Sequence, residues 1–123
     1  MMMDWNAYQA QVQAGVAGIG RASVGIVRGY RELSDAGNKT NVLDAKTREL
    51  IALAVAVTRQ CDGCITIHTD AAITQGATRD EVIEAVGVAI AVNAGAALVY
   101  STRVLDAYDA KTSTSTPAPA AGG

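Results

Sequence analysis

The sequence predicts an all-α protein, a compact bundle of about five to six helices. Half of the 123 residues are hydrophobic, yet only 4% are aromatic and none is Phe, so the core must consist of closely packed aliphatic side chains. Apolar residues recur at three- and four-residue spacing, and no strand-like alternation persists. The length makes a single domain the default. We expect a helical domain over residues 1–110.

The first predicted helical region runs from Asp4 to about Ala36, where apolar residues follow the helical spacing. Several glycines weaken it, each by about 1 kcal/mol relative to Ala in a helix interior. We therefore expect two helices, separated by a break near Gly20. The turn-forming residues 35–38 end the second one.

Two further helices follow, joined by a short link. One is predicted from about Asp44, a preferred N-cap type, to Arg59, and the next from Asp62 to Gln75. Gly76 supplies the C-terminal cap of the latter, because glycine adopts left-handed backbone angles without steric cost.

The clearest helix start is the capping box formed by Thr78 and Glu81, in which each side chain can bond the other's backbone N–H. The helix that it opens is expected to reach about Val92. The residues Asn93-Ala94-Gly95 predict a break before a last helix over 96–110. Residues 111–123 contain no large apolar side chain, and we expect a disordered tail there.

The charge balance argues against nucleic acid as a partner. The net charge is -2 and charged residues make up 18% of the chain, which leaves no basic surface for a polyanion. The mean hydropathy of +0.18 is high for a soluble monomer and suggests buried contacts between subunits. The apolar stretch from Val82 to Tyr100 has the length of a membrane span, but it contains Glu84 and Asn93 and follows the start of a soluble-type helix. We expect a cytoplasmic protein without a membrane partner.

The reactive residues are concentrated in one segment. Both cysteines and the one histidine, Cys61, Cys64 and His68, are spaced i, i+3 and i+7, so they lie along one face of a helix. A helix N-terminus near Cys61 would stabilise a thiolate. A Cys-X-X-Cys pair can close a disulfide across one turn, one thiol attacking and the other resolving. The helix dipole favours Cys61 as the attacking thiol, and the i, i+4 spacing to His68 favours Cys64.

Glu49 is the fourth candidate. It lies on the apolar face of the preceding helix, where desolvation would prepare its carboxylate to act as a general base. The short link makes the two helices antiparallel neighbours, so we expect Glu49 to approach His68.

Simpler interpretations exist for each residue. His68 could be a hydrogen-bonded, partly buried side chain, the cysteines could be small core residues, and Glu49 could pair with Lys46 or Arg48. Zinc accepts all four candidate ligand types, but a Cys pair within one turn and a His one turn later form an awkward tetrahedron. We therefore expect no metal and no other cofactor.

Along the chain, Glu49 is followed after eleven residues by Cys61-X-X-Cys64, and His68 follows after three more. This pattern resembles the signature of the alkylhydroperoxidase D-like proteins, which belong to the carboxymuconolactone decarboxylase superfamily. The helix before the cysteines and the segment after the histidine are also similar, so the resemblance covers residues 42–110. It departs at Gly63, where the peroxidase carries a second histidine, and this chain resembles a single copy of the helical unit.

The resemblance implies a homo-oligomer, a trimer or a hexamer, that reduces small hydroperoxides. By this resemblance Glu49 is the base, His68 transmits the proton, and Cys61 and Cys64 cycle between dithiol and disulfide. An external dithiol, such as a lipoyl-bearing protein, re-reduces the pair. Two alternatives are a lyase of the decarboxylase branch, which does not need paired thiols, and a non-catalytic oligomeric or metal-binding protein.

Overall fold

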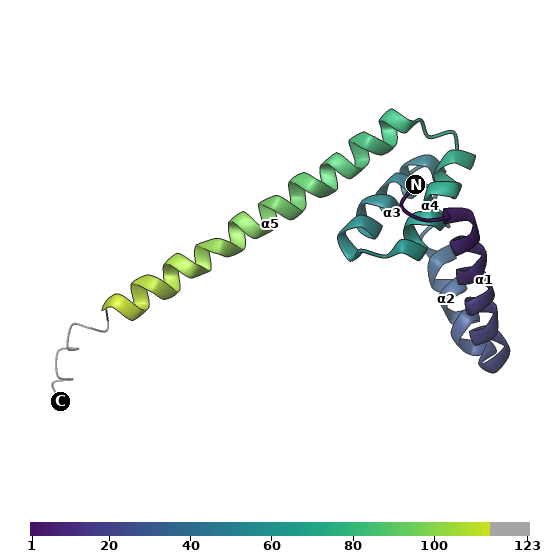
Figure 1. Cartoon of the computed structure of the whole chain (residues 1–123), viewed down its shortest axis with the longest axis horizontal. Coiled ribbons are helices and arrows are strands. Elements are labelled where there is room, and N and C mark those ends of the chain that lie inside the picture. The colour runs from purple at the N-terminus through teal and green to yellow at the C-terminus, as the bar shows by residue number, and fades with distance from the viewer. Residues whose placement is uncertain (114–123) are drawn as a thin grey trace. The chain divides into compact units, whose positions relative to one another are not determined.

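The structure is a computed structural model that describes residues 1–113. Every regular element in this range is an α-helix, and there are five of them, which confirms the all-α prediction. The chain divides into two units, Met1–Ala89 and a second that begins at Ile90. The first contains α1–α4 and the start of α5, and the described part of the second consists of the remainder of α5 (Figure 1).

Helices α1 (Trp5–Ala22) and α2 (Val24–Ala36) pack against each other. The break between them lies at Ser23, whose extended backbone (φ -147°, ψ 91°) interrupts the helix three residues after the expected position. Gly20 remains helical because a glycine weakens a helix by only about 1 kcal/mol and does not end it by itself. A Cβ at Gly20 would lie 3.4 Å from Val27 Cγ2, so this glycine allows α1 and α2 to approach closely.

Helices α3 (Ala45–Arg59) and α4 (Asp62–Thr74) form the best-buried part of the first unit, and α4 also packs against α1. Both agree with the predicted spans to within one residue. The predicted N-cap is confirmed, because Asp44 Oδ1 accepts from the Thr47 backbone N–H at 2.7 Å. The buried residues of these two helices are small or aliphatic: Leu53, Ala56, Thr66 and Ala72.

Gly76 ends α4 as predicted. Its φ is +84°, and the N–H groups of Gly76 and Ala77 donate to the carbonyls of Ile73 and Ala72, both at 2.9 Å. This is the Schellman pattern of a helix C-terminus, which requires a left-handed residue at the position that Gly76 occupies.

Helix α5 (Arg79–Ser113) begins with the predicted capping box: Thr78 N–H donates to Glu81 Oε1 at 3.0 Å, and Glu81 N–H to Thr78 Oγ1 at 3.1 Å. The predicted break at residues 93–95 is wrong, since α5 is continuous. Neither Asn nor Gly removes a backbone donor as proline would, and the flanking alanines are strong helix formers. The prediction of a tail from residue 111 is also wrong for residues 111–113, which are helical; residues 114–123 lie outside the described range.

One helix of the described chain, α5, is long and apolar enough to cross a membrane by length and composition. The core helix of a soluble protein has the same properties, so these two criteria do not distinguish the two environments.

Candidate active site

The link between α3 and α4 fixes the first cysteine. Gln60 has left-handed backbone angles (φ 52°, ψ 48°), and Cys61 N–H donates to the Ala56 carbonyl at 3.1 Å. Together with the bond from Gln60 N–H to the Val57 carbonyl, this forms a second Schellman pattern. The backbone of Cys61 is thus part of the C-terminal cap of α3.

The same cysteine is the N-cap of α4. Its Sγ accepts from the Cys64 backbone N–H at 3.2 Å, and the two sulfurs are joined in a disulfide with the Cα atoms 5.3 Å apart. The free N–H groups and positive dipole end of α4 therefore point at Cys61. Once the disulfide is reduced, this position favours a thiolate.

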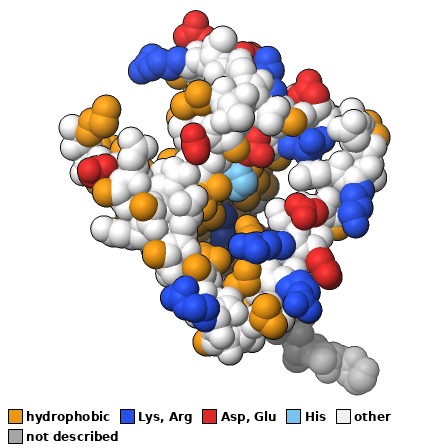
Figure 2. Space-filling model, turned by 90° about the vertical axis from the view of Figure 1, so that its right-hand side faces the viewer, with side chains coloured by type: hydrophobic (Ala, Val, Ile, Leu, Met, Phe, Trp, Pro, Cys, Tyr) orange, Lys and Arg blue, Asp and Glu red, His pale blue; other side chains and the backbone are white. Residues whose placement is uncertain are grey.

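Glu49 and His68 form the second pair. Glu49 Oε2 lies 2.7 Å from His68 Nδ1, so the contact expected from the antiparallel packing of α3 and α4 exists. With Nδ1–H donating to the carboxylate, the imidazole presents Nε2 as its free nitrogen. Both side chains are partly exposed, His68 at 34% and Glu49 at 25%, and Figure 2 shows the histidine (pale blue) at the molecular surface.

The neighbouring cations that could have paired with Glu49 have other partners. Lys46 Nζ contacts Glu81 Oε2 at 2.7 Å, and Arg48 Nη1 donates to the Leu43 carbonyl. The hydrogen bond to Glu81 raises the pKa of Lys46, and the same bond, together with the Thr78 N–H, lowers the pKa of the Glu81 carboxyl. His68 is therefore the partner of Glu49, and the simpler interpretation with Lys46 or Arg48 is wrong.

The four predicted residues thus form two pairs, with Cys64 and His68 one turn apart on α4. Within residues 1–113, no three His, Cys, Asp or Glu side chains form a group that could hold a metal ion. The arrangement provides a two-electron couple in the cysteines and a proton-transfer pair in the histidine and the carboxylate.

One contact at this site has no signal in the sequence. A Cβ at Gly63, the residue before the second cysteine, would lie 3.5 Å from Val12 Cγ1 of α1. Helix α1 therefore packs on the Cys-X-X-Cys segment, where a Cβ at position 63 would already be in van der Waals contact with Val12. The absence of the second histidine thus matches the local packing.

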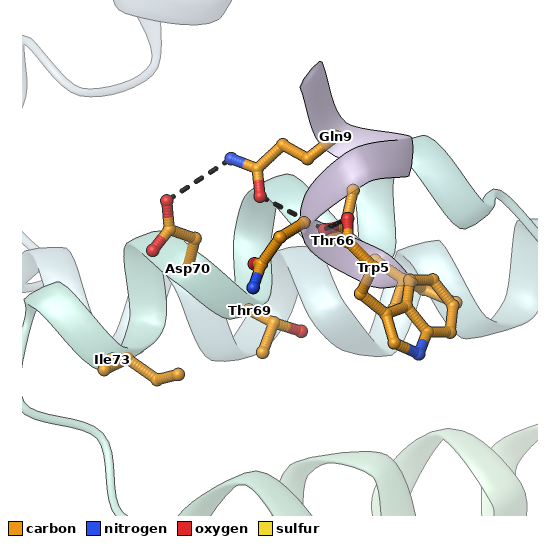
Figure 3. Close-up of a pocket in the computed structure, with 8 residues that line it drawn as sticks. Trp5, Gln9, Thr66, Thr69, Asp70 and Ile73 are labelled. Atoms are coloured by element: carbon orange, nitrogen blue, oxygen red, sulfur yellow. Dashed lines mark hydrogen bonds between the residues drawn. The ribbon is translucent and has the colours of Figure 1, made fainter. Parts of the chain in front are cut away.

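A pocket of about 390 Å³ lies between α1 and the side of α4 that carries Thr66, Thr69 and Asp70, as Figure 3 shows. Gln9 connects its polar groups: Thr66 Oγ1 donates to Gln9 Oε1 at 3.1 Å, and Gln9 Nε2 donates to Asp70 Oδ2 at 3.3 Å. None of the four predicted site residues lines this pocket. The candidate active site is therefore separate from it, on the face of α4 that meets α3.

The chain is similar to several bacterial proteins. It is 45% identical over 108 residues to an uncharacterized protein of Haemophilus influenzae, covering 88% of this chain and 96% of that protein. It is 37% identical over 89 residues to an uncharacterized protein from the cox locus of Paracoccus denitrificans, covering 72% and 80%. The similarity to each of these relatives extends along most of both chains, so it is not confined to the residues of the signature.

A solved structure agrees with the fold. The crystal structure of an apo carboxymuconolactone decarboxylase family protein from Legionella pneumophila has a TM-score of 0.69 and 32% identity, covering 85% of this chain and 94% of that chain. The sequence profile of the carboxymuconolactone decarboxylase family matches residues 25–107, which include both pairs of site residues. The helical fold, the matched range and the relative from Legionella together show that this chain belongs to the carboxymuconolactone decarboxylase family.

Proposed function

We propose that this protein is a thiol-dependent reductase of small alkyl hydroperoxides. The observation that carries the proposal is the contact of 2.7 Å between Glu49 Oε2 of α3 and His68 Nδ1 of α4. Helix α4 is the helix whose N-terminal end carries the Cys61–Cys64 disulfide. A purely structural disulfide would not require a histidine one turn away, held in one tautomer by a carboxylate. A redox pair requires both thiolate formation and protonation of an oxygen leaving group.

The proposed reaction starts from the reduced pair. One thiolate attacks the terminal peroxide oxygen, so an S–O bond forms and the O–O bond breaks. The alkoxide that leaves takes a proton, delivered through His68, and departs as the alcohol. The second thiol attacks the resulting sulfenic acid, which closes the Cys61–Cys64 disulfide and releases water. The peroxide is reduced by two electrons and the two thiols are oxidised by two.

The cycle closes with an external dithiol as the reductant. Its thiolate attacks the disulfide to form a mixed disulfide, and its second thiol then releases the reduced protein. Both site pairs are partly exposed, which suits a dithiol carried on another protein, such as a lipoyl group. Such a cycle needs a reducing compartment, and we place the protein in the cytoplasm.

The test is a thiol titration of the reduced protein before and after one equivalent of cumene hydroperoxide. We expect two thiols per chain to disappear, one equivalent of cumyl alcohol to form, and peptide mapping to find the Cys61–Cys64 disulfide. The matched control is the Cys61→Ser, Cys64→Ser double variant, which should leave the peroxide intact. Failure of the wild-type protein to form the disulfide would refute the proposal.

The same double variant tests the lyase alternative. Decarboxylation of a carboxylated lactone does not need the thiol pair, so such an activity would survive the double substitution. We expect neither the wild-type protein nor the variant to release carbon dioxide from such a substrate. Release by both proteins would favour the lyase.

A further inference from the structure

A second pocket, of about 530 Å³, lies between α1 and α2, the two helices that run side by side in Figure 1. Its volume is within the range of small-molecule sites, about 300–1,000 Å³. None of the candidate active-site residues lines it, and it shares no residue with the pocket between α1 and α4. The proposed redox function gives this pocket no role.

One part of the pocket lining is apolar. Val16 of α1 and Val24 and Val27 of α2 belong to it. Val27 packs against Gly20, where a Cβ would lie 3.4 Å from Val27 Cγ2, whereas Val24 is 61% exposed. A ligand lying on Val16 and Val24 would remove apolar surface from water, which favours an aliphatic molecule.

The lining also contains three arginines, Arg21 of α1 and Arg28 and Arg31 of α2. The contact of Gly20 with Val27 sets the register of the two helices, so position 18 of α1 lies opposite residues 28–31 of α2. Arg21 Nη2 would be 3.6 Å from a Cβ at Gly18, so its guanidinium group lies at that height. The three arginines therefore lie within about one helical turn of each other along the pocket.

These three cations have no partner within residues 1–113, where no ion pair or hydrogen bond involves their side chains. Two acidic residues also line the pocket, Glu32 and Asp35. They follow Arg28 and Arg31 by four residues, a spacing that permits ion pairs on a helix, yet none forms. Three guanidinium groups and two carboxylates leave the lining with a net charge of +1, which one bound monoanion would neutralise.

The charge and the apolar lining together identify the class of ligand. A guanidinium group binds a carboxylate through two parallel N–H···O hydrogen bonds. A phosphate with two charges would exceed the net charge of the lining, and the carboxylates of Glu32 and Asp35 would repel it. Arg31 and Val24 are seven residues apart on α2, about 10 Å along the helix, so a medium-length alkyl chain can reach from one to the other.

We propose that the pocket between α1 and α2 binds the carboxylate form of a medium-chain aliphatic acid. Arg28 and Arg31 hold the carboxylate, Arg21 supplies a third positive charge from α1, and the alkyl chain lies on Val16 and Val24. This site does not depend on the proposed redox function.

Calorimetric titration with decanoate at pH 7 tests the site. The wild-type protein should bind one decanoate per chain with a Kd of about 100 µM. The Arg28→Gln, Arg31→Gln double variant should bind at least tenfold more weakly. The matched control is the Arg79→Gln, Arg103→Gln double variant, which loses the same charge outside the pocket and should change the Kd by less than twofold.

Circular dichroism of both double variants should show the helix content of the wild-type protein. Equal losses of affinity in the two variants would overturn the proposal, as would a wild-type protein that binds no decanoate at millimolar concentration.

A series of ligands tests the same site without any substitution. Decanol lacks the charge, and acetate and inorganic phosphate lack the alkyl chain, so each should bind the wild-type protein at least tenfold more weakly than decanoate. Decanol binding as tightly as decanoate would show that the arginines are not used. Phosphate or acetate binding as tightly would show that the valines are not used, and either result would refute the proposal.

The Cys61→Ser, Cys64→Ser double variant separates this site from the redox pair. It should bind decanoate with the wild-type Kd, because neither cysteine lines the pocket. A loss of affinity beyond twofold would place decanoate at the cysteines, and the assignment to the pocket between α1 and α2 would be wrong.

Discussion

His68 can serve as a proton carrier because one of its ring nitrogens is already committed. When the Glu49 carboxylate accepts a hydrogen bond from Nδ1–H, Nε2 is left to exchange a proton with a thiol or an oxygen leaving group. It also stabilises the imidazolium that forms when Nε2 takes up a proton. The carboxylate therefore acts through the histidine, as a positioning residue in the proposed reaction.

Glu49→Gln should slow peroxide reduction by about 100-fold, within the range found for general acid–base groups. The amide retains a polar group at the position but loses the negative charge that supports the imidazolium. The measurement is kcat/KM for cumene hydroperoxide with dithiothreitol as reductant. Glu84→Gln, a carboxylate of the same chain outside the site, is the control and should be unchanged. A loss below threefold for Glu49→Gln would contradict the assigned role.

The Lys46–Glu81 pair predicts how stability depends on pH. The hydrogen bond from Lys46 lowers the pKa of Glu81 below its ordinary 4.5, so the unfolded chain takes up this proton at higher pH than the folded one. The contribution to stability is therefore complete above about pH 4.5 and is lost as the pH falls through the folded pKa. The raised pKa of Lys46 means that the pair is also lost at alkaline pH, above the ordinary 10.5.

The difference in Tm between the wild-type protein and Glu81→Gln, measured across the pH range, checks this prediction. It should be largest near neutral pH, begin to shrink below about pH 4.5, and vanish once the pH is below the folded pKa of Glu81. The control is Glu32→Gln, whose Tm difference from the wild-type protein should not follow the same profile. A constant difference for Glu81→Gln would show that the pair does not act through its charge.

At the scale of the helices, the two left-handed residues at the ends of α3 and α4 are directly comparable. Gln60 (φ 52°) carries a side chain in a backbone region that suits glycine, whereas Gly76 (φ 84°) does not. Gln60→Gly should stabilise the protein by about 0.5 kcal/mol, and Gly76→Ala should destabilise it by about 1 kcal/mol. Urea denaturation measures both, and destabilisation by Gln60→Gly would show that the glutamine side chain supports the link.

The packing of α1 on α4 predicts the cost of restoring the second histidine. Gly63→His should destabilise the protein by about 2 kcal/mol, because the Cβ position is already in van der Waals contact with Val12 and the imidazole adds bulk beside it. Val12→Ala alone removes contacts, but in combination with Gly63→His it should recover about half of the loss. Double-mutant analysis of denaturation curves gives the coupling, and additive effects would show that the two positions do not meet.

The helix starts were predictable because their signals are local. Asp44 and the Thr78–Glu81 box depend on residues within one turn, and both are found as expected. The break at Ser23 and the continuity of α5 were missed, because a glycine only weakens a helix and its surroundings decide the outcome. The Glu49–His68 contact was expected from helix pairing, whereas Val12 on Gly63 depends on tertiary packing that no short-range pattern encodes.

At the scale of the whole molecule, the two units should respond differently to dilution. The core of α3 and α4 is internal to one chain, but the helical segment from Ile90 onward has exposed apolar side chains, which the homo-oligomer implied by the family resemblance would cover. Helices in water depend mainly on packing for their stability. Hydrogen exchange in residues 90–113 should therefore quicken on dilution, while residues 45–74 should be unaffected. Equal behaviour of the two ranges would contradict this.

Cys61 belongs to two helix caps at once, and this limits what the redox change can do to the shape of the protein. Its N–H completes the end of α3 and its sulfur begins α4. Residues three apart in an ordinary α-helix have Cα atoms about 5 Å apart, close to the 5.3 Å across this disulfide. The backbone therefore already has the spacing that either state requires. A reductant would meet the same surface on the oxidised and the reduced protein, so it must discriminate between the two forms by the chemistry of the sulfurs. The reduced protein would therefore compete with the oxidised protein for binding to the reductant.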